Sequence, residues 1–174
     1  AIELLFEEMP TRPTANAIFR EARKIFGDIN IINRDENDIE FSVDKFVAYN
    51  EDNTTSPVVL AMGNITDFDD KVAVSEFERT QIWNVANSEE LLSKYKYAVK
   101  IWDVNAQRQI PKERAIMLVD WLNVALKLYP KCQAIWIKSA GKLQLAQSIK
   151  NLKETGIVKY LYSMVNIRFF NVPN

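Results

Sequence analysis

Carboxylate side chains are the groups in this chain that could carry out chemistry. Glu7 and Glu8 directly follow a short apolar run, and Asp103 lies inside a longer one. A pair of carboxylates can act as general acid and base, or can bind Mg²⁺ or Ca²⁺ through oxygen. We take Glu7, Glu8 and Asp103 as candidate binding residues, and we expect no catalytic residue, no metal site and no cofactor.

Most other catalytic chemistries are excluded by what the sequence lacks. It contains no histidine, which removes Ser–His–Asp and Cys–His nucleophilic sites together with most zinc and non-haem iron sites. The single cysteine, Cys132, is expected to be a small buried hydrophobic residue rather than a nucleophile. The four glycines, Gly27, Gly63, Gly141 and Gly156, are too far apart to form a phosphate-binding loop or a dinucleotide-binding fingerprint.

Other acidic residues have simpler interpretations. Asp67, Asp69 and Asp70 resemble part of a calcium-binding loop, but the glycine and the terminal glutamate of an EF-hand are missing, so we interpret them as solvated loop charges. Asp103 differs, because Val99 and Ile101, which should point to the same face of the strand, are apolar. If that face is turned toward the core, Asp103 must be paired or have a strongly shifted pKa. We expect a basic partner and a structural ion pair.

Residues 97–138 predict a strand–helix–strand unit around which the chain is organised. Residues 97–104 and 134–138 are rich in β-branched and aromatic side chains, which favour buried strands. Residues 111–129 carry apolar side chains at helical spacing around more than half of the circumference, so more than one neighbour must cover this helix. If the two strands run parallel in one sheet, the crossover is expected to be right-handed.

The tryptophans are interpreted as core residues. Trp102, Trp121 and Trp136 all belong to this unit, and we expect them to anchor one core, each burying roughly 150–250 Å². A sugar- or peptide-binding platform would instead require at least two exposed tryptophans.

The rest of the pattern predicts an α+β fold. Further strands are expected at 2–6, 29–32, 39–49 with a bend, 57–62 and 165–170. Helices are expected after an N-cap at Thr14 and up to Gly27, once or twice within 75–94, and at 142–155. Together these elements predict a mixed sheet of six to seven strands, with helices packed mainly on one face and the βαβ unit at 97–138 within it.

Composition indicates one globular domain spanning residues 1–174. Apolar residues make up 48% of the chain and charged residues 26%, which is ordinary for a folded protein. One cysteine cannot form an internal disulfide, so we expect a cytoplasmic protein. No apolar run approaches the roughly 18 residues of a membrane span. The chain closes on an aromatic and apolar segment, so we expect the natural protein to continue beyond Asn174.

The net charge of −1 hides a sharp division between the two halves of the chain. Residues 1–90 have a net charge of −11, and residues 91–174 have a net charge of +10. We expect the halves to pack together and compensate each other. Nucleic-acid binding by the basic half is the alternative, and it would require strongly salt-dependent affinity. No RNA-binding or zinc-finger motif accompanies the basic residues, so nucleic acid is not the expected partner.

Several segments resemble a known bacterial family. They are LLFEE at 4–8, the strand that reaches Asp103, the helix that begins at Pro111, and AIWIKSAG at 134–141. With these segments the chain resembles the family called domain of unknown function 4261 over most of its length. The resemblance implies a bacterial protein and an association with toxin–immunity gene neighbourhoods. It transfers no activity and no catalytic residue.

We interpret the protein as a non-enzymatic interaction module that binds another protein through an acidic surface. The more specific interpretation is an immunity-type protein. Residues 35–52 hold seven acidic side chains, which could steer a basic toxin domain. The alternative is an enzyme that uses carboxylates, with or without a divalent metal. That alternative needs a pocket holding at least two of Glu7, Glu8, Asp67, Asp69, Asp70 and Asp103. The oligomeric state is left open.

Overall fold

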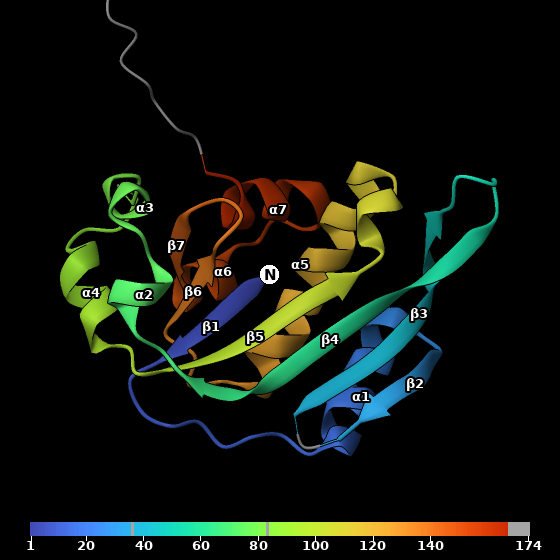
Figure 1. The fold of residues 1–174 in the computed structure, drawn as a ribbon, viewed down its shortest axis with the longest axis horizontal. Coiled ribbons are helices and arrows are strands. Elements are labelled where there is room, and N and C mark those ends of the chain that lie inside the picture. The colour runs from blue at the N-terminus through green and yellow to red at the C-terminus, as the bar shows by residue number, and fades with distance from the viewer. Residues whose placement is uncertain (36, 83, 167–174) are drawn as a thin grey trace, which may run out of the picture.

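The computed structural model describes residues 1–35, 37–82 and 84–166, and these residues fold around one seven-stranded sheet (Figure 1). The strands are β1 (Ile2–Phe6), β2 (Ile29–Arg34), β3 (Asp38–Tyr49), β4 (Thr55–Asp67), β5 (Tyr97–Val104), β6 (Ala134–Ile137) and β7 (Lys142–Leu145). The helices are α1 (Ala15–Phe26), α2 (Asp70–Ala73), α3 (Glu76–Thr80), α4 (Ser88–Lys94), α5 (Pro111–Leu128), α6 (Ala146–Asn151) and α7 (Gly156–Met164), with a 3₁₀ turn at Ala106–Arg108.

The order of strands shows how the N-terminus is built into the sheet. The order is β2-β3-β4-β5-β1-β6-β7, and each neighbouring pair is antiparallel. Because β1 is antiparallel to both β5 and β6, these two strands run in the same direction, and α5 connects them. The predicted α+β class and the number of strands are confirmed. The sheet is antiparallel throughout, however, and not mixed as predicted, because the N-terminal strand β1 inserts between β5 and β6 and keeps these two parallel strands from pairing directly.

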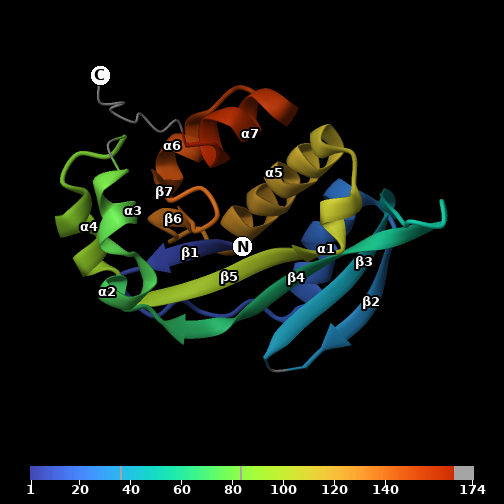
Figure 2. The ribbon, with the colours of Figure 1, turned by 45° about the horizontal axis from the view of Figure 1, so that its top comes forward.

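Side chains of the sheet alternate between two cores on opposite faces. On β1, Ile2, Leu4 and Phe6 belong to the larger core, whereas Leu5 belongs to the smaller one. The larger core lies under α1, α5, α6 and α7, and the smaller core lies under the short helices α2–α4 at one end of the sheet (Figures 1 and 2). The prediction that helices pack mainly on one face is therefore confirmed.

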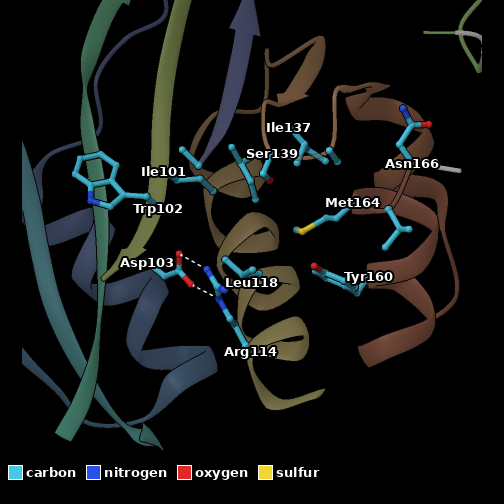
Figure 3. Close-up of a pocket in the computed structure, with 14 residues that line it drawn as sticks. Ile101, Trp102, Asp103, Arg114, Leu118, Ile137, Ser139, Tyr160, Met164 and Asn166 are labelled. Carbon is cyan, nitrogen blue, oxygen red and sulfur yellow. Dashed lines mark hydrogen bonds and ion pairs between the residues drawn. The ribbon is translucent and has the colours of Figure 1, made fainter. Parts of the chain in front are cut away.

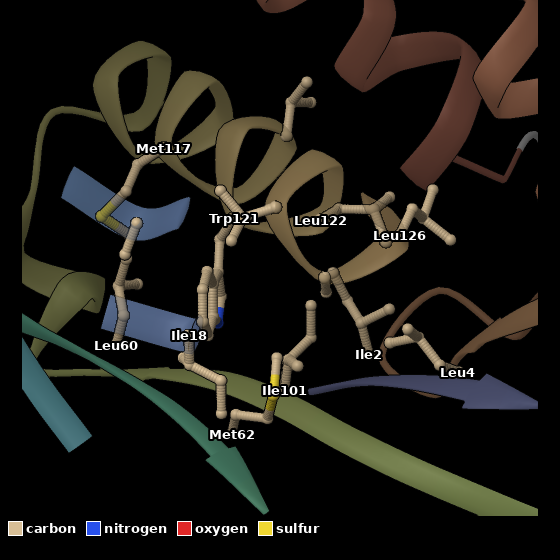
Figure 4. Packing of buried hydrophobic residues seen from close by; sticks show 14 of the residues in the cluster. Ile2, Leu4, Ile18, Leu60, Met62, Ile101, Met117, Trp121, Leu122 and Leu126 are labelled. Carbon is tan, nitrogen blue, oxygen red and sulfur yellow. The ribbon is translucent and has the colours of Figure 1, made fainter. Parts of the chain in front are cut away.

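Trp121 is the centre of the larger core. It is fully buried and reaches from α5 toward β4 and β5 (Figure 4). Its ring meets Phe41 edge-on, with centroids 5.3 Å apart, and its Nε1–H donates a hydrogen bond to the carbonyl oxygen of Ala61 at 3.2 Å. Both contacts tie α5 to the middle of the sheet.

The expectation that three tryptophans anchor one core is wrong. Trp121 lies in the larger core, Trp136 lies in the smaller core on the opposite face, and Trp102 is only half-buried. On β6 the apolar residues alternate, so Ile135 and Ile137 face α5 while Trp136 faces away from it. The sequence correctly predicted apolar side chains at these positions, but it did not predict the face of the sheet on which each side chain lies.

Two predicted elements have different bounds. The strand predicted at 57–62 continues to Asp67, because β4 resumes its pairing with β5 after an irregularity between Met62 and Ile65. The helix predicted at 142–155 begins only at Ala146, because Lys142–Leu145 pairs with β6 as strand β7. Gly141, with a φ of 57°, lies in the turn between these two strands.

The structure also tests the predicted ends of helix α1 and the strand predicted near the C-terminus. The N-cap at Thr14 is confirmed, since its hydroxyl oxygen accepts a hydrogen bond from the Ala17 N–H at 3.3 Å. Helix α1 ends at Gly27, whose φ is 78°. Of the strand predicted at 165–170, residues 165 and 166 are not in a strand, and the remainder lies outside the described residues.

An ion-pair cluster joins α1 to α5 beside the larger core. The carboxylate of Glu21 lies 2.7 Å from Lys127 Nζ and 2.6 Å from Lys24 Nζ. The Lys127 contact also links the acidic half of the chain to the basic half, as does a pair between Arg108 and Glu51 at 3.5 Å. Hydrogen bonds from Lys127 and Lys24 lower the pKa of Glu21 to about 2.

We expect Glu21 to make folding sensitive to acid in a defined range. A carboxyl whose pKa falls from 4.5 to about 2 on folding stabilises the protein above pH 4.5, and this contribution is lost as the pH falls toward 2. In the Glu21→Gln variant, the free energy of unfolding should depend less steeply on pH between 4.5 and 2. Denaturant unfolding at several pH values measures this slope, and a slope equal to that of the unmodified protein would contradict the prediction.

Candidate functional site

Asp103 is paired with a basic residue, as the sequence predicted. On β5, Asp103 lies two residues after Ile101 and four after Val99, so the three side chains point to the same face of the sheet, toward α5. Arg114, in the first turns of α5, donates from Nε to Asp103 Oδ2 at 2.8 Å and from Nη2 to Oδ1 at 3.3 Å. This two-point contact fixes the plane of the guanidinium group. Hydrogen bonding to Asp103 raises the pKa of Arg114 above its ordinary value.

The ion pair forms one wall of a cavity of about 400 Å³. The cavity lies between the ends of β1, β5 and β6 and the helices α5 and α7 (Figure 3). Its apolar walls come from Ile101, Leu118, Ile137 and Met164, while Tyr160 extends from α7 toward α5. The cavity therefore combines an apolar interior with a fixed guanidinium group, which is a common composition for small-molecule sites.

Helix α7 is held over this cavity by a buried lysine. Lys142, on β7, donates from Nζ to the carbonyl oxygens of Tyr162 and Val165, both at 2.7 Å. These are carbonyls at the C-terminal end of α7, where a cation is favourable. Burial lowers the pKa of Lys142. The sequence reasoning placed this residue in a helix and missed its role.

Glu7 and Glu8 lie far from Asp103. They follow the last residue of β1, whereas Asp103 lies near its first residue, where Ile2 pairs with Ile101. Five residues of strand separate the two ends by roughly 17 Å. Both glutamates are exposed and line a separate hollow of about 370 Å³, together with Lys131. The structure thus divides the three candidates between two places.

Of the remaining acidic candidates, Asp67 is exposed at the end of β4, whereas Asp69 and Asp70 have structural roles at the helices α2 and α3. Asp69 caps α2 by accepting a hydrogen bond from the Lys71 N–H, and Asp70 forms an ion pair with Arg79 at 2.8 Å. Among the residues that the structure describes, no group of three or more histidine, cysteine or acidic side chains could hold a metal ion. Cys132 is buried, as predicted, and burial raises the pKa of its thiol to about 12.

A second candidate surface is the part of the sheet that α2–α4 leave uncovered. Glu3, Lys100 and Trp102 lie side by side there, and Lys100 Nζ is 5.5 Å from the centroid of the Trp102 ring. Gly63 allows the tryptophan to lie flat on β4, since a Cβ at this position would come within 3.3 Å of the ring. Burial raises the pKa of Glu3.

Acidic side chains follow β3 and its two turns along the edge of this surface. We call this set the acidic ridge. It consists of Asp35, Asp38, Glu40, Asp44, Glu51 and Asp52. Strand β3 has 12 residues, so the ridge extends over about 40 Å. Strand β3 lies beside β2, the edge strand of the sheet (Figure 1). The sequence reasoning found these residues but not their arrangement.

The chain is thus an antiparallel α+β protein with one partly uncovered sheet face. It has a small cavity beside Asp103 and an acidic ridge along β3. No protein-family model, no curated protein and no solved structure matches the chain. Within the described residues, no helix is both long enough and apolar enough to cross a membrane. The resemblance to domain of unknown function 4261 stays a prediction.

Proposed function

We propose that this protein is a non-enzymatic protein-binding module whose acidic ridge docks onto a basic surface of a partner protein. The observation that carries the proposal is the concentration of exposed and half-buried acidic groups along one uncovered edge of the sheet. Residues 28–55 contain eight acidic and two basic side chains. The negative electrostatic potential of these side chains accelerates association with a basic partner and disfavours binding of acidic proteins.

The ridge is rigid where it is most exposed. Asp35 Oδ1 accepts hydrogen bonds from the backbone N–H groups of Asn37 and Asp38, each at 2.8 Å. In the other turn, Asp52 accepts from the hydroxyl and the backbone N–H of Thr54. These bonds lower the pKa values of both aspartates, so these two residues keep their charge in mildly acidic solution. Preformed turns reduce the entropy that a partner's binding would cost.

The edge strand beside the ridge supplies apolar contact. In β2, Ile31 is 42% exposed and Ile32 is 55% exposed. The strand pairs with β3 on one side, and in the described part of the chain its other side has no neighbouring strand. An open strand edge can pair with an extended segment of another protein. A partner segment that carries lysine or arginine side chains would then meet both the isoleucines and the ridge.

The more specific proposal is an immunity-type protein in the bacterial cytoplasm that binds a basic toxin domain. It is supported by the sign of the ridge and by the resemblance described above. The alternative of a carboxylate-based enzyme has less support, because Asp103 is engaged by Arg114 and lies at the other end of β1 from Glu7 and Glu8.

The proposal is tested by charge neutralisation on the ridge. The triple variant Glu40→Gln, Asp44→Asn and Glu51→Gln leaves the aspartates that hold the turns in place. Tagged protein is used to recover partners from the native host at low salt. We expect the unmodified protein to retain one basic partner, and the triple variant to bind it at least about tenfold more weakly, because several charges are lost.

A matched control removes the same charge elsewhere. Asp67→Asn, Glu76→Gln and Glu90→Gln change exposed acidic groups at or near α2–α4, and this variant should bind the partner as the unmodified protein does. Raising the ionic strength should weaken binding to the unmodified protein. Recovery of no protein partner, or equal loss of binding in both triple variants, would disprove docking through the ridge.

A further inference from the structure

The cavity beside Asp103 and Arg114 has the features of a ligand site that is separate from the acidic ridge. We propose that it binds a small monocarboxylate with an apolar body, such as an aryl-alkyl or medium-chain aliphatic acid. The guanidinium group of Arg114 would bind the carboxylate, and the side chains between β5, α5 and α7 would enclose the apolar part. This inference does not depend on the proposed function of the ridge.

The interior of the cavity suits an apolar body. Leu118 on α5 and Tyr160 on α7 are half-buried and present apolar surface to the cavity (Figure 3). Ile101, Ile137 and Met164 also line it, but they are almost fully buried and join it to the larger core. A volume of about 400 Å³ lies within the range of roughly 300–1,000 Å³ that is usual for small-ligand pockets. Burial of apolar ligand surface supplies most of the binding free energy at such sites.

The charged group that the cavity exposes to a ligand is the guanidinium of Arg114. The side chain of Asp103 is 9% exposed and its two oxygens are both bonded to Arg114, whereas the side chain of Arg114 is 39% exposed. Arg114 uses Nε and Nη2 for Asp103, and its other N–H groups have no partner among the described residues. The free edge of a guanidinium group matches a carboxylate in a two-point contact. Asp103 thus acts as a positioning residue.

Tyr160 provides a second polar group at the same place. Its hydroxyl points from α7 toward the ion pair (Figure 3), and it makes no hydrogen bond to another described residue. A phenolic O–H can donate to the oxygen of a carboxylate that is already bound to the arginine. Because Lys142 holds the end of α7, the hydroxyl and the guanidinium lie on two fixed helices, and the site is preformed.

The test uses 3-phenylpropanoate and octanoate as probes, and the corresponding alcohols, 3-phenylpropanol and octanol, as matched controls. Binding is measured by calorimetry and by amide chemical shifts of residues around the cavity. We expect both acids to bind, with the alcohols at least about tenfold weaker, because a charge-assisted contact to arginine is lost. Equal affinity of acids and alcohols would overturn the assignment of a carboxylate.

Two conservative variants locate the site. Arg114→Lys keeps a cation beside Asp103 but lacks the two-point fork, and it should weaken binding of the acids about tenfold while leaving the alcohols unchanged. Tyr160→Phe removes only the hydroxyl and should weaken the acids about three- to tenfold. Thermal unfolding verifies that both variants fold. Undiminished binding in both variants, or no binding of either acid to the unmodified protein, would overturn the proposal.

Discussion

Replacement of Trp121 by alanine is expected to lower the free energy of unfolding by about 3–5 kcal/mol. The side chain is fully buried, so its removal leaves a cavity between α5 and β4 that the backbone can only partly close. The variant also loses the edge-on contact with Phe41 and the hydrogen bond to the carbonyl of Ala61. Urea unfolding, followed by far-UV circular dichroism, measures the change.

A matched pair of phenylalanine substitutions separates the hydrogen bond from the packing. Trp121→Phe removes the donor to Ala61, whereas Trp136 Nε1 is buried and has no hydrogen-bond partner among the described residues. Both tryptophans are fully buried. Trp121→Phe should therefore be more destabilising than Trp136→Phe by about 1 kcal/mol, the usual net value of a hydrogen bond. Equal losses in the two variants would show that the Ala61 contact contributes nothing measurable.

Replacement of Lys142 by methionine is expected to destabilise the end of α7 and to cost about 2 kcal/mol of unfolding free energy. The variant keeps the aliphatic stem but leaves the carbonyls of Tyr162 and Val165 without their donor. The desolvation of the ammonium group, which also lowers the pKa of Lys142, offsets part of the gain from these bonds. Amide hydrogen exchange should accelerate in α7 more than in α5.

Lys138 offers the control for this prediction. It is an exposed lysine in the turn before β7, and Lys138→Met removes the same charge without touching α7. This variant should change stability by less than about 0.5 kcal/mol. Because α7 forms one wall of the cavity, Lys142→Met should also weaken binding of the carboxylate probes. Unchanged exchange rates in α7 would contradict the role assigned to Lys142.

The candidate site was only partly predictable. The apolar alternation in β5 was sufficient to predict that Asp103 faces inward and needs a basic partner. It was not sufficient to identify Arg114, although a cation near the start of the predicted helix was a signal that could have been followed. Tyr160 and Met164 come from a helix distant in sequence, and their part in the cavity depends on how α7 is placed.

By itself, the sequence determined which segments are strands and helices wherever a local pattern was strong. Strand β5, the long helix α5 and the cap at Thr14 follow from alternation, helical spacing and hydrogen-bonding chemistry over a few residues. The absence of histidine likewise limits the chemistry without reference to any fold. These properties depend on neighbours in the chain.

The tertiary structure alone decided which faces and segments meet. The pairing of β1 between β5 and β6, the opposite faces of Trp121 and Trp136, and strand β7 in place of a helix all depend on contacts between distant segments. A side-chain period of two specifies that neighbouring residues face opposite ways, but not which way is toward α5. The joining of Asp103, Arg114 and Tyr160 in one cavity, and their separation from Glu7 and Glu8, follow from this long-range pairing.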